Sequence, residues 1–184
     1  MDIQRFQPSH PGLFTHLAAA GWRAGQSPVH ADPELWALPD THFSIHEPGI
    51  SCMVELTGIE LDITPADGLR SRFRFGCRDI LSTMSQQPGF TLDVLKILGT
   101  LRQPYPQDGY PIGEGAGSVL FLREDLTAAL IDQSLCGFFR APNPFILLDW
   151  FLLRIPSIHI EHHAVHQGDR IARHIDASGK RLDG

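Results

Sequence analysis

Two short segments with alternating side chains and opposite charges are the strongest constraint on how this chain folds. Apolar and acidic residues alternate over 59–63, and basic and apolar residues alternate over 70–75, with a Pro-Ala-Asp-Gly turn between them. A period of two predicts strands with one buried face, and the opposite charges predict that these strands pair as an antiparallel hairpin. In the expected register, Asp62 faces Arg70, Glu60 faces Arg72, Ile63 meets Leu69 and Ile59 meets Phe73.

Other elements are predicted from the spacing of apolar residues and from start and stop residues. Apolar residues recur at helical intervals in several segments that begin near proline or end at glycine. The predicted helices cover 8–22, 31–39, 50–56, 91–99 and 144–154. Two apolar runs, 119–122 and 127–131, predict a second hairpin of central strands. A length of 184 residues fits one domain of ordinary size.

The charge balance argues against nucleic acid as a partner. Lys and Arg number 15 against 21 Asp and Glu, so the formal net charge is −6, whereas phosphate binding needs a basic surface. From Ala24 to Leu69 there is no Lys or Arg, but there are eight carboxylates. This acidic block either steers a basic protein partner or is neutralised by arginines from elsewhere in the fold.

Cysteine usage and hydropathy indicate a protein of the reducing cytoplasm. The three cysteines form no CxxC pair, so neither a disulfide framework nor a thiolate zinc site is predicted. Segment 1–10 has no continuous apolar run, so we expect no secretory signal peptide. The most apolar stretch, 145–155, is too short to cross a bilayer and contains Asp149 and Arg154. We therefore expect a cytoplasmic chain without a membrane partner.

The glycine-rich string YPIGEGAG at 110–117 is the only sequence that suggests a phosphate loop. It lacks the lysine of a Walker loop and leads into an apolar run rather than a helix. We expect a structural loop whose glycines permit positive φ and close backbone approach. No GxSxG elbow surrounds a serine, and the cysteines lack a local catalytic motif, so no catalytic residues are assigned.

Four histidines near the C-terminus are the candidate metal ligands. On a helix, His159, His162, His163 and His166 would line one stripe and could bind zinc, nickel or copper. The isoleucines on either side of His159 instead alternate as in a strand, which would scatter the imidazoles over two faces. Solvated histidines on a polar tail are the expected interpretation, and no metal or cofactor is assigned; a metal-binding protein or metal-dependent enzyme is the alternative.

The order of several motifs resembles the SUKH superfamily of SMI/KNR-like immunity proteins. The likeness covers about residues 9–154. It consists of a helix ending in Gly21-Trp22, ELTGIELDI at 55–63, YPIGE at 110–114, GSVLFL at 117–122 with a following strand, and an apolar closing helix. The resemblance implies an α+β fold, in which helices pack on a mainly antiparallel sheet in a single domain, 1–154. A polar, His-rich C-terminal extension, 155–184, lies outside it.

The same resemblance implies function through binding rather than catalysis. Such bacterial immunity proteins bind a cognate toxin of a polymorphic toxin system and neutralise it by protein–protein interaction in the cytoplasm. The acidic block agrees with a basic toxin, for example of the nuclease type. The residues that we expect to contact the toxin are Glu34, Trp36, Asp40 and Glu47.

Overall fold

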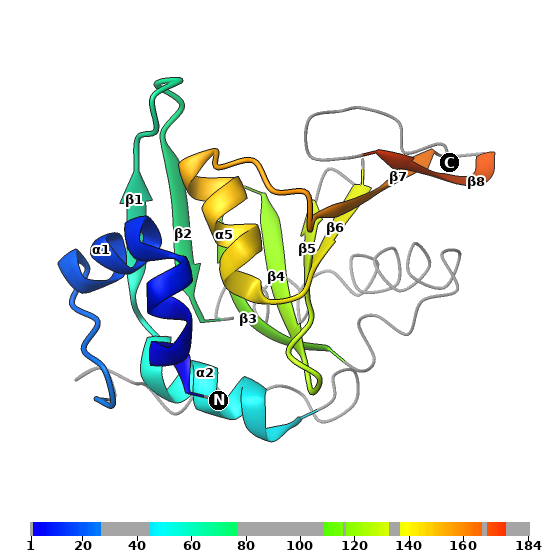
Figure 1. The fold of residues 1–184 in the computed structure, drawn as a ribbon. Coiled ribbons are helices and arrows are strands. Elements are labelled where there is room, and N and C mark those ends of the chain that lie inside the picture. Colours follow the sequence, from blue (N-terminus) through cyan, green and yellow to red (C-terminus); the bar gives the residue numbers. More distant parts are fainter. Residues whose placement is uncertain are drawn as a thin grey trace, which may run out of the picture.

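The computed structural model describes residues 2–26, 45–76, 109–115, 117–132, 137–166 and 169–175. Within these ranges an eight-stranded antiparallel sheet carries helices on one face, which confirms the predicted α+β class (Figure 1). No described helix is long and apolar enough to cross a bilayer. The elements are η1 (Ile3–Ser9), α1 (Pro11–Ala19), α2 (Glu47–Leu56), β1 (Glu60–Ile63), β2 (Ser71–Phe75), β3 (Gly109–Gly115), β4 (Ser118–Arg123), β5 (Ala128–Asp132), β6 (Gly137–Ala141), α5 (Pro144–Leu153), β7 (Glu161–His166) and β8 (Asp169–Ile175).

The sheet is a meander in which strands adjacent in the chain are adjacent in space. The strand order runs from β1 to β8, so these two strands form the edges of the sheet among the described residues. The predicted helices at 50–56 and 144–154 correspond to α2 and α5, and the predicted second hairpin is β4–β5. The predicted helix over 8–22 is shorter, because η1 precedes α1 and Gly21 turns the chain with a φ of 101°. The predicted helices at 31–39 and 91–99 lie outside the described residues.

The first hairpin forms as β1–β2, but the expected register is wrong by two residues. Glu60 pairs with Arg74 rather than with Arg72, and Asp62 pairs with Arg72 rather than with Arg70. A shift of two keeps every side chain on its own face, whereas a shift of one would exchange the faces. The alternation of buried and exposed residues within β1 and β2 was therefore predicted correctly even though the register was not, whereas the expected burial of Leu69 is wrong.

The chemistry of the turn explains this shift. The Asp67 side chain accepts a hydrogen bond from the Leu69 amide at 2.9 Å, and Gly68 adopts a φ of 74°. This hydrogen bond and the left-handed glycine hold 64–70 as the connection between the strands, which is longer than the Pro-Ala-Asp-Gly turn that the sequence suggested. Leu69 is consequently 64% exposed instead of meeting Ile63.

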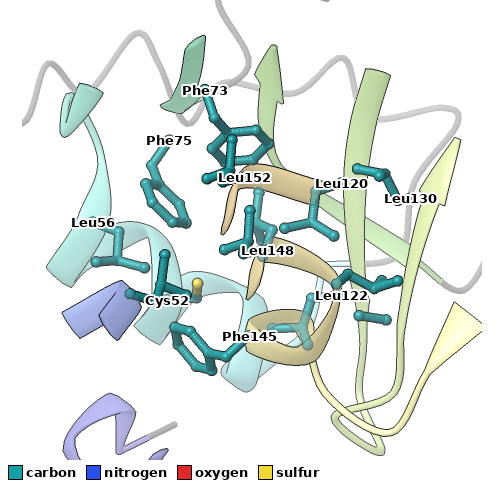
Figure 2. Close-up of a cluster of buried hydrophobic side chains, with 14 of the residues drawn as sticks. Cys52, Leu56, Phe73, Phe75, Leu120, Leu122, Leu130, Phe145, Leu148 and Leu152 are labelled. Atoms are coloured by element: carbon teal, nitrogen blue, oxygen red, sulfur yellow. The ribbon is translucent and has the colours of Figure 1, made fainter. Parts of the chain in front are cut away.

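Helix α5 supplies the centre of the hydrophobic core. It begins at a proline that follows Asn143, whose side chain accepts hydrogen bonds from the amides of Phe145 and Ile146 at 3.0 and 3.1 Å. The helix lies across one face of the sheet and packs on apolar residues of β2, β4 and β5 (Figures 1 and 2). The buried side chains drawn there include Cys52, Leu56, Phe73, Phe75, Leu120, Leu122, Leu130, Phe145, Leu148 and Leu152.

Residues 110–115 of the glycine-rich string form a strand and not the expected loop. Residues 109–115 form β3 between β2 and β4. The expected close approach is confirmed, since a Cβ on Gly115 would lie 2.1 Å from the Arg72 carbonyl oxygen, and one on Gly113 would lie 2.6 Å from the Phe73 ring. Positive φ occurs only beyond the strand, at Gly117 with 77°. These glycines let β3 and β2 approach closely. In the sequence, glycines that serve close strand contact look the same as glycines of a turn.

The chain beyond residue 154 continues the sheet. Ile160 is 1% exposed and belongs to the core, and β7 pairs with β6 in an antiparallel register that sets Phe139 opposite His162. Their rings stack with centroids 4.4 Å apart at an interplanar angle of 9°. The division of the chain at 154/155 stays a prediction, but the first part of the predicted extension packs against the predicted domain.

The buried thiol of Cys52 gives a test of the packing between α2 and the core. Burial, followed by the neighbouring Glu55 carboxylate, raises the pKa of Cys52 to about 12. Because the thiolate is the reactive form, we expect no alkylation of Cys52 by iodoacetamide in the native protein at about pH 8, and rapid alkylation in denaturant. Peptide mass mapping measures this residue separately from the other cysteines. Native alkylation at the denatured rate would contradict the described packing.

Candidate partner-binding face

The polar face of the first three strands carries charges that alternate from strand to strand. Glu60 of β1 lies opposite Arg74 of β2, which lies opposite Glu114 of β3, and Asp62 lies opposite Arg72. We call these five residues the charge ladder. Their neighbours in β1 and β2 point to the other face and are buried in the core.

Ion pairs connect the members of the charge ladder. Arg74 Nε lies 3.5 Å from Glu60 Oε1, and Arg72 Nε donates to Asp62 Oδ2 at 3.2 Å. Arg70, at the end of the turn, donates two further hydrogen bonds to Asp62, one of them at 2.6 Å from Nε. The hydrogen bonds from Arg70, together with the one from Arg72, lower the pKa of Asp62 to about 2. Asp62 is thus ionised under all ordinary conditions.

A hollow of about 300 Å³ follows the charge ladder. Carboxylates and guanidinium groups of the ladder line it, together with backbone of β3 at Gly115. The Glu60 side chain remains 67% exposed and that of Arg72 74% exposed. This face therefore offers charged groups of both signs, at fixed spacing, to a partner.

The acidic block is partly neutralised by arginines, as one of the two sequence-based alternatives proposed. Arginines of β2 pair with Glu60 and Asp62, and Arg154 at the end of α5 pairs with Asp67 at 3.2 Å. Glu55 differs from these three, since burial and then the nearby Asp2 carboxylate raise its pKa. In the described part of this block, Glu60, Asp62 and Asp67 are consequently paired with arginines at and beside the β1–β2 hairpin.

Three of the four predicted toxin-contact residues, Glu34, Trp36 and Asp40, lie outside the described residues. Glu47 is described and exposed at the first position of α2. It follows His46, whose imidazole accepts a hydrogen bond from the Gly49 amide at 3.1 Å and lies 2.9 Å from the Leu122 carbonyl oxygen. These contacts require the Nε2–H tautomer, which donates to Leu122. The role of Glu34, Trp36, Asp40 and Glu47 in binding stays a prediction.

The candidate metal-binding histidines are not arranged on a helix. His162, His163 and His166 belong to the strand β7, and His159 lies in the preceding turn. Consecutive residues of a strand point to opposite faces, so the helical stripe is not formed. The described residues contain no group of three or more His, Cys, Asp or Glu side chains placed to hold a metal ion. Metal binding by His159, His162, His163 and His166 stays the untested alternative, and the helical arrangement that would have favoured it is not formed.

A buried histidine–carboxylate pair joins the N-terminal segment to α5, and sequence reasoning missed it. His10 Nδ1 lies 2.6 Å from Asp149 Oδ2, and both side chains are at most 13% exposed. Burial raises the pKa of Asp149, although the hydrogen bond and charge of His10 oppose that shift. The two residues are 139 positions apart in the chain. The one sequence signal for this pair was the position of Asp149 within an apolar helix, because a buried carboxylate needs a partner.

Comparison with protein-family models, with curated proteins and with solved structures gives no match. The assignment of a function therefore depends on the residues and the geometry of this chain.

Proposed function

We propose that the chain is a non-catalytic immunity protein of the SUKH type that binds and neutralises a cognate bacterial toxin in the cytoplasm. Support comes first from the order of elements. Trp22 follows α1 and packs edge-on against Phe14 with ring centroids 5.2 Å apart, the PIGE string lies within β3, and β4–β5 and α5 follow. This succession agrees with the motif order on which the resemblance is based.

The observation that carries the proposal is the charge ladder on an exposed sheet face. Its carboxylates and guanidinium groups are held in register by three paired strands, so little ordering is needed when a partner binds. Fixed charges of both signs select the orientation and identity of a protein partner more than they add affinity. Binding of this kind needs no cofactor and no catalytic residue.

Co-expression tests this proposal. If the chain is an immunity protein, production of the toxin encoded beside it should stop growth, and co-production of this chain should restore growth. The two proteins should also co-elute in size-exclusion chromatography, because neutralisation here is binding. A vector that expresses an unrelated acidic domain of similar size is the control. Unaltered killing in the presence of folded chain would contradict the proposed function.

A further inference from the structure

The outer edge of β1 has hydrogen-bonding groups that no described strand uses. The Phe75 amide donates to the Ile59 carbonyl at 2.9 Å, so Ile59 directs its carbonyl towards β2. Backbone groups in a strand alternate in direction, which turns those of Leu61 and Ile63 towards β2 as well. The amides and carbonyls of Glu60 and Asp62 therefore point away from β2, at the end of the strand order.

The side chains at this edge define what an added strand must carry. Along one row of the charge ladder the signs run negative at Glu114, positive at Arg74 and negative at Glu60, so the next position outwards calls for a positive charge. In the second row Arg72 is followed by Asp62, whose carboxylate also accepts hydrogen bonds from Arg70, so the requirement for a further positive charge is carried mainly by Glu60. Opposite charges stabilise directly facing positions of an antiparallel pair, and like charges destabilise them.

A second copy of this chain does not satisfy that requirement. Antiparallel pairing of two β1 strands about a twofold axis would set Glu60 of one copy against Asp62 of the other. Facing carboxylates of this kind disfavour pairing of two β1 edges. An extended segment with basic residues at alternate positions is the complementary occupant.

We propose that β1 is a docking edge that accepts an extended, basic segment of a protein partner as an additional antiparallel strand. Two basic side chains of that segment, two positions apart, lie opposite Glu60 and Asp62 on the face of the charge ladder. The residue between them is apolar and lies on the face of Leu61, which is 2% exposed. The two residues of the segment that face Glu60 and Asp62 exchange backbone hydrogen bonds with them.

This inference deepens the proposed function by naming the chemistry of the partner segment, and it rests on that function only for the identity of the partner. A synthetic peptide, acetyl-Thr-Lys-Val-Lys-Val-Thr-amide, is a suitable probe. In an NMR titration we expect the amides of Glu60 and Asp62 to shift and to gain protection from hydrogen exchange. The same peptide with glutamate in place of lysine should bind at least about tenfold more weakly.

Modified peptides and variants separate strand addition from general charge attraction. N-methylation of the backbone nitrogens of the two lysines removes the N–H groups that face β1 and should abolish binding. N-methylation of the backbone nitrogens of the two valines removes N–H groups that point away from β1 and should preserve binding. Glu60→Lys should weaken binding of the basic peptide about tenfold. Glu124→Lys, on the exposed β4–β5 turn, makes the same change in net charge and should leave binding unchanged.

Several results would overturn the docking edge. These are no binding by the native chain, equal weakening by Glu60→Lys and Glu124→Lys, or no effect of lysine N-methylation. The co-expression experiment separates this inference from the proposed function. If the native chain and Glu60→Lys neutralise the toxin equally, the edge is wrong and the immunity function stands. If the toxin is not neutralised while the peptide still protects both amides, the edge stands and the immunity function is wrong.

Discussion

Replacement of Phe145 by alanine is expected to lower the free energy of unfolding by about 3–5 kcal/mol. The side chain is 1% exposed, and its ring centroid lies 4.9 Å from that of Phe6 and 5.3 Å from that of Phe14. Phe145 thus connects η1 and α1 to α5, and Figure 2 shows its ring among the buried side chains of the core. Its removal leaves a cavity at a junction of several elements, which can collapse only partly. Urea unfolding followed by circular dichroism measures the loss.

Phe151 provides the matched control for this prediction, because it lies on the same helix and is only partly buried. Phe151→Ala makes the same chemical change but removes less buried surface, so we expect less than half the destabilisation. In thermal unfolding, Phe145→Ala should lower Tm by roughly 6–20 °C. Equal losses for the two variants would show that Phe145 is not the centre of the core.

Local patterns were sufficient to predict which residues of the two strands β1 and β2 are buried, but not that Leu69 in the turn is exposed. Alternation separates Leu61 from Asp62 whatever the register, because a period of two is a property of each strand alone. The register depends on the turn, where one hydrogen bond from the Leu69 amide to Asp67 lengthens the loop. Turn contacts of this kind are not encoded in the hydrophobic pattern, which is why the predicted pairs were displaced while the faces were correct.

The candidate site was predictable to the extent that it follows from strand chemistry. Opposite charges in the two segments indicated a paired polar face, and β1–β2 has one. The continuation onto Glu114 was not foreseen, because the glycines around it suggested a loop. Gly113 and Gly115 are present for close contact with β2, and a contact between strands so distant in the chain leaves no local signature.

The pairing of β7 with β6 could not be derived from composition either. Polar residues and histidines made the C-terminal region resemble an appendage, yet a strand needs only one apolar face or an open edge to join a sheet. The His162 ring of β7 stacks on Phe139. Phe139 in turn contacts Trp150 of α5, with ring centroids 4.4 Å apart, so the strand is attached to the core. Burial lowers the pKa of His162, which favours the neutral ring in this stack.

Loss of His10 should destabilise the protein by about 3–5 kcal/mol at neutral pH, because it leaves the Asp149 carboxylate buried without its partner. The other carboxylate oxygen of Asp149 already has no hydrogen-bond partner among the described residues. His10→Ala therefore removes the one described side chain that stabilises this charge. His16→Ala, at an exposed position of the neighbouring helix α1, is the control and should change the free energy of unfolding by less than about 0.5 kcal/mol.

The pH dependence of this effect distinguishes a buried charge from a simple loss of packing. The pKa of Asp149 is already raised in the folded chain, and removal of His10 also removes the interactions that lower it. A carboxyl whose folded pKa lies above its unfolded value of 3.8 binds a proton more tightly when folded. The contribution of this carboxyl to the free energy of unfolding is then fully present below the unfolded pKa, and it is lost as the pH rises through the folded pKa.

The difference in unfolding free energy between His10→Ala and the double variant His10→Ala/Asp149→Asn should consequently depend on pH. Asparagine has no charge to bury, so the double variant should be the more stable at about pH 7.5, and its advantage should shrink towards about pH 4. Other carboxyl groups titrate equally in both proteins and cancel in the difference. A difference that is constant over this range would mean that Asp149 carries no unpaired charge in the absence of His10, and that the pair contributes through shape alone.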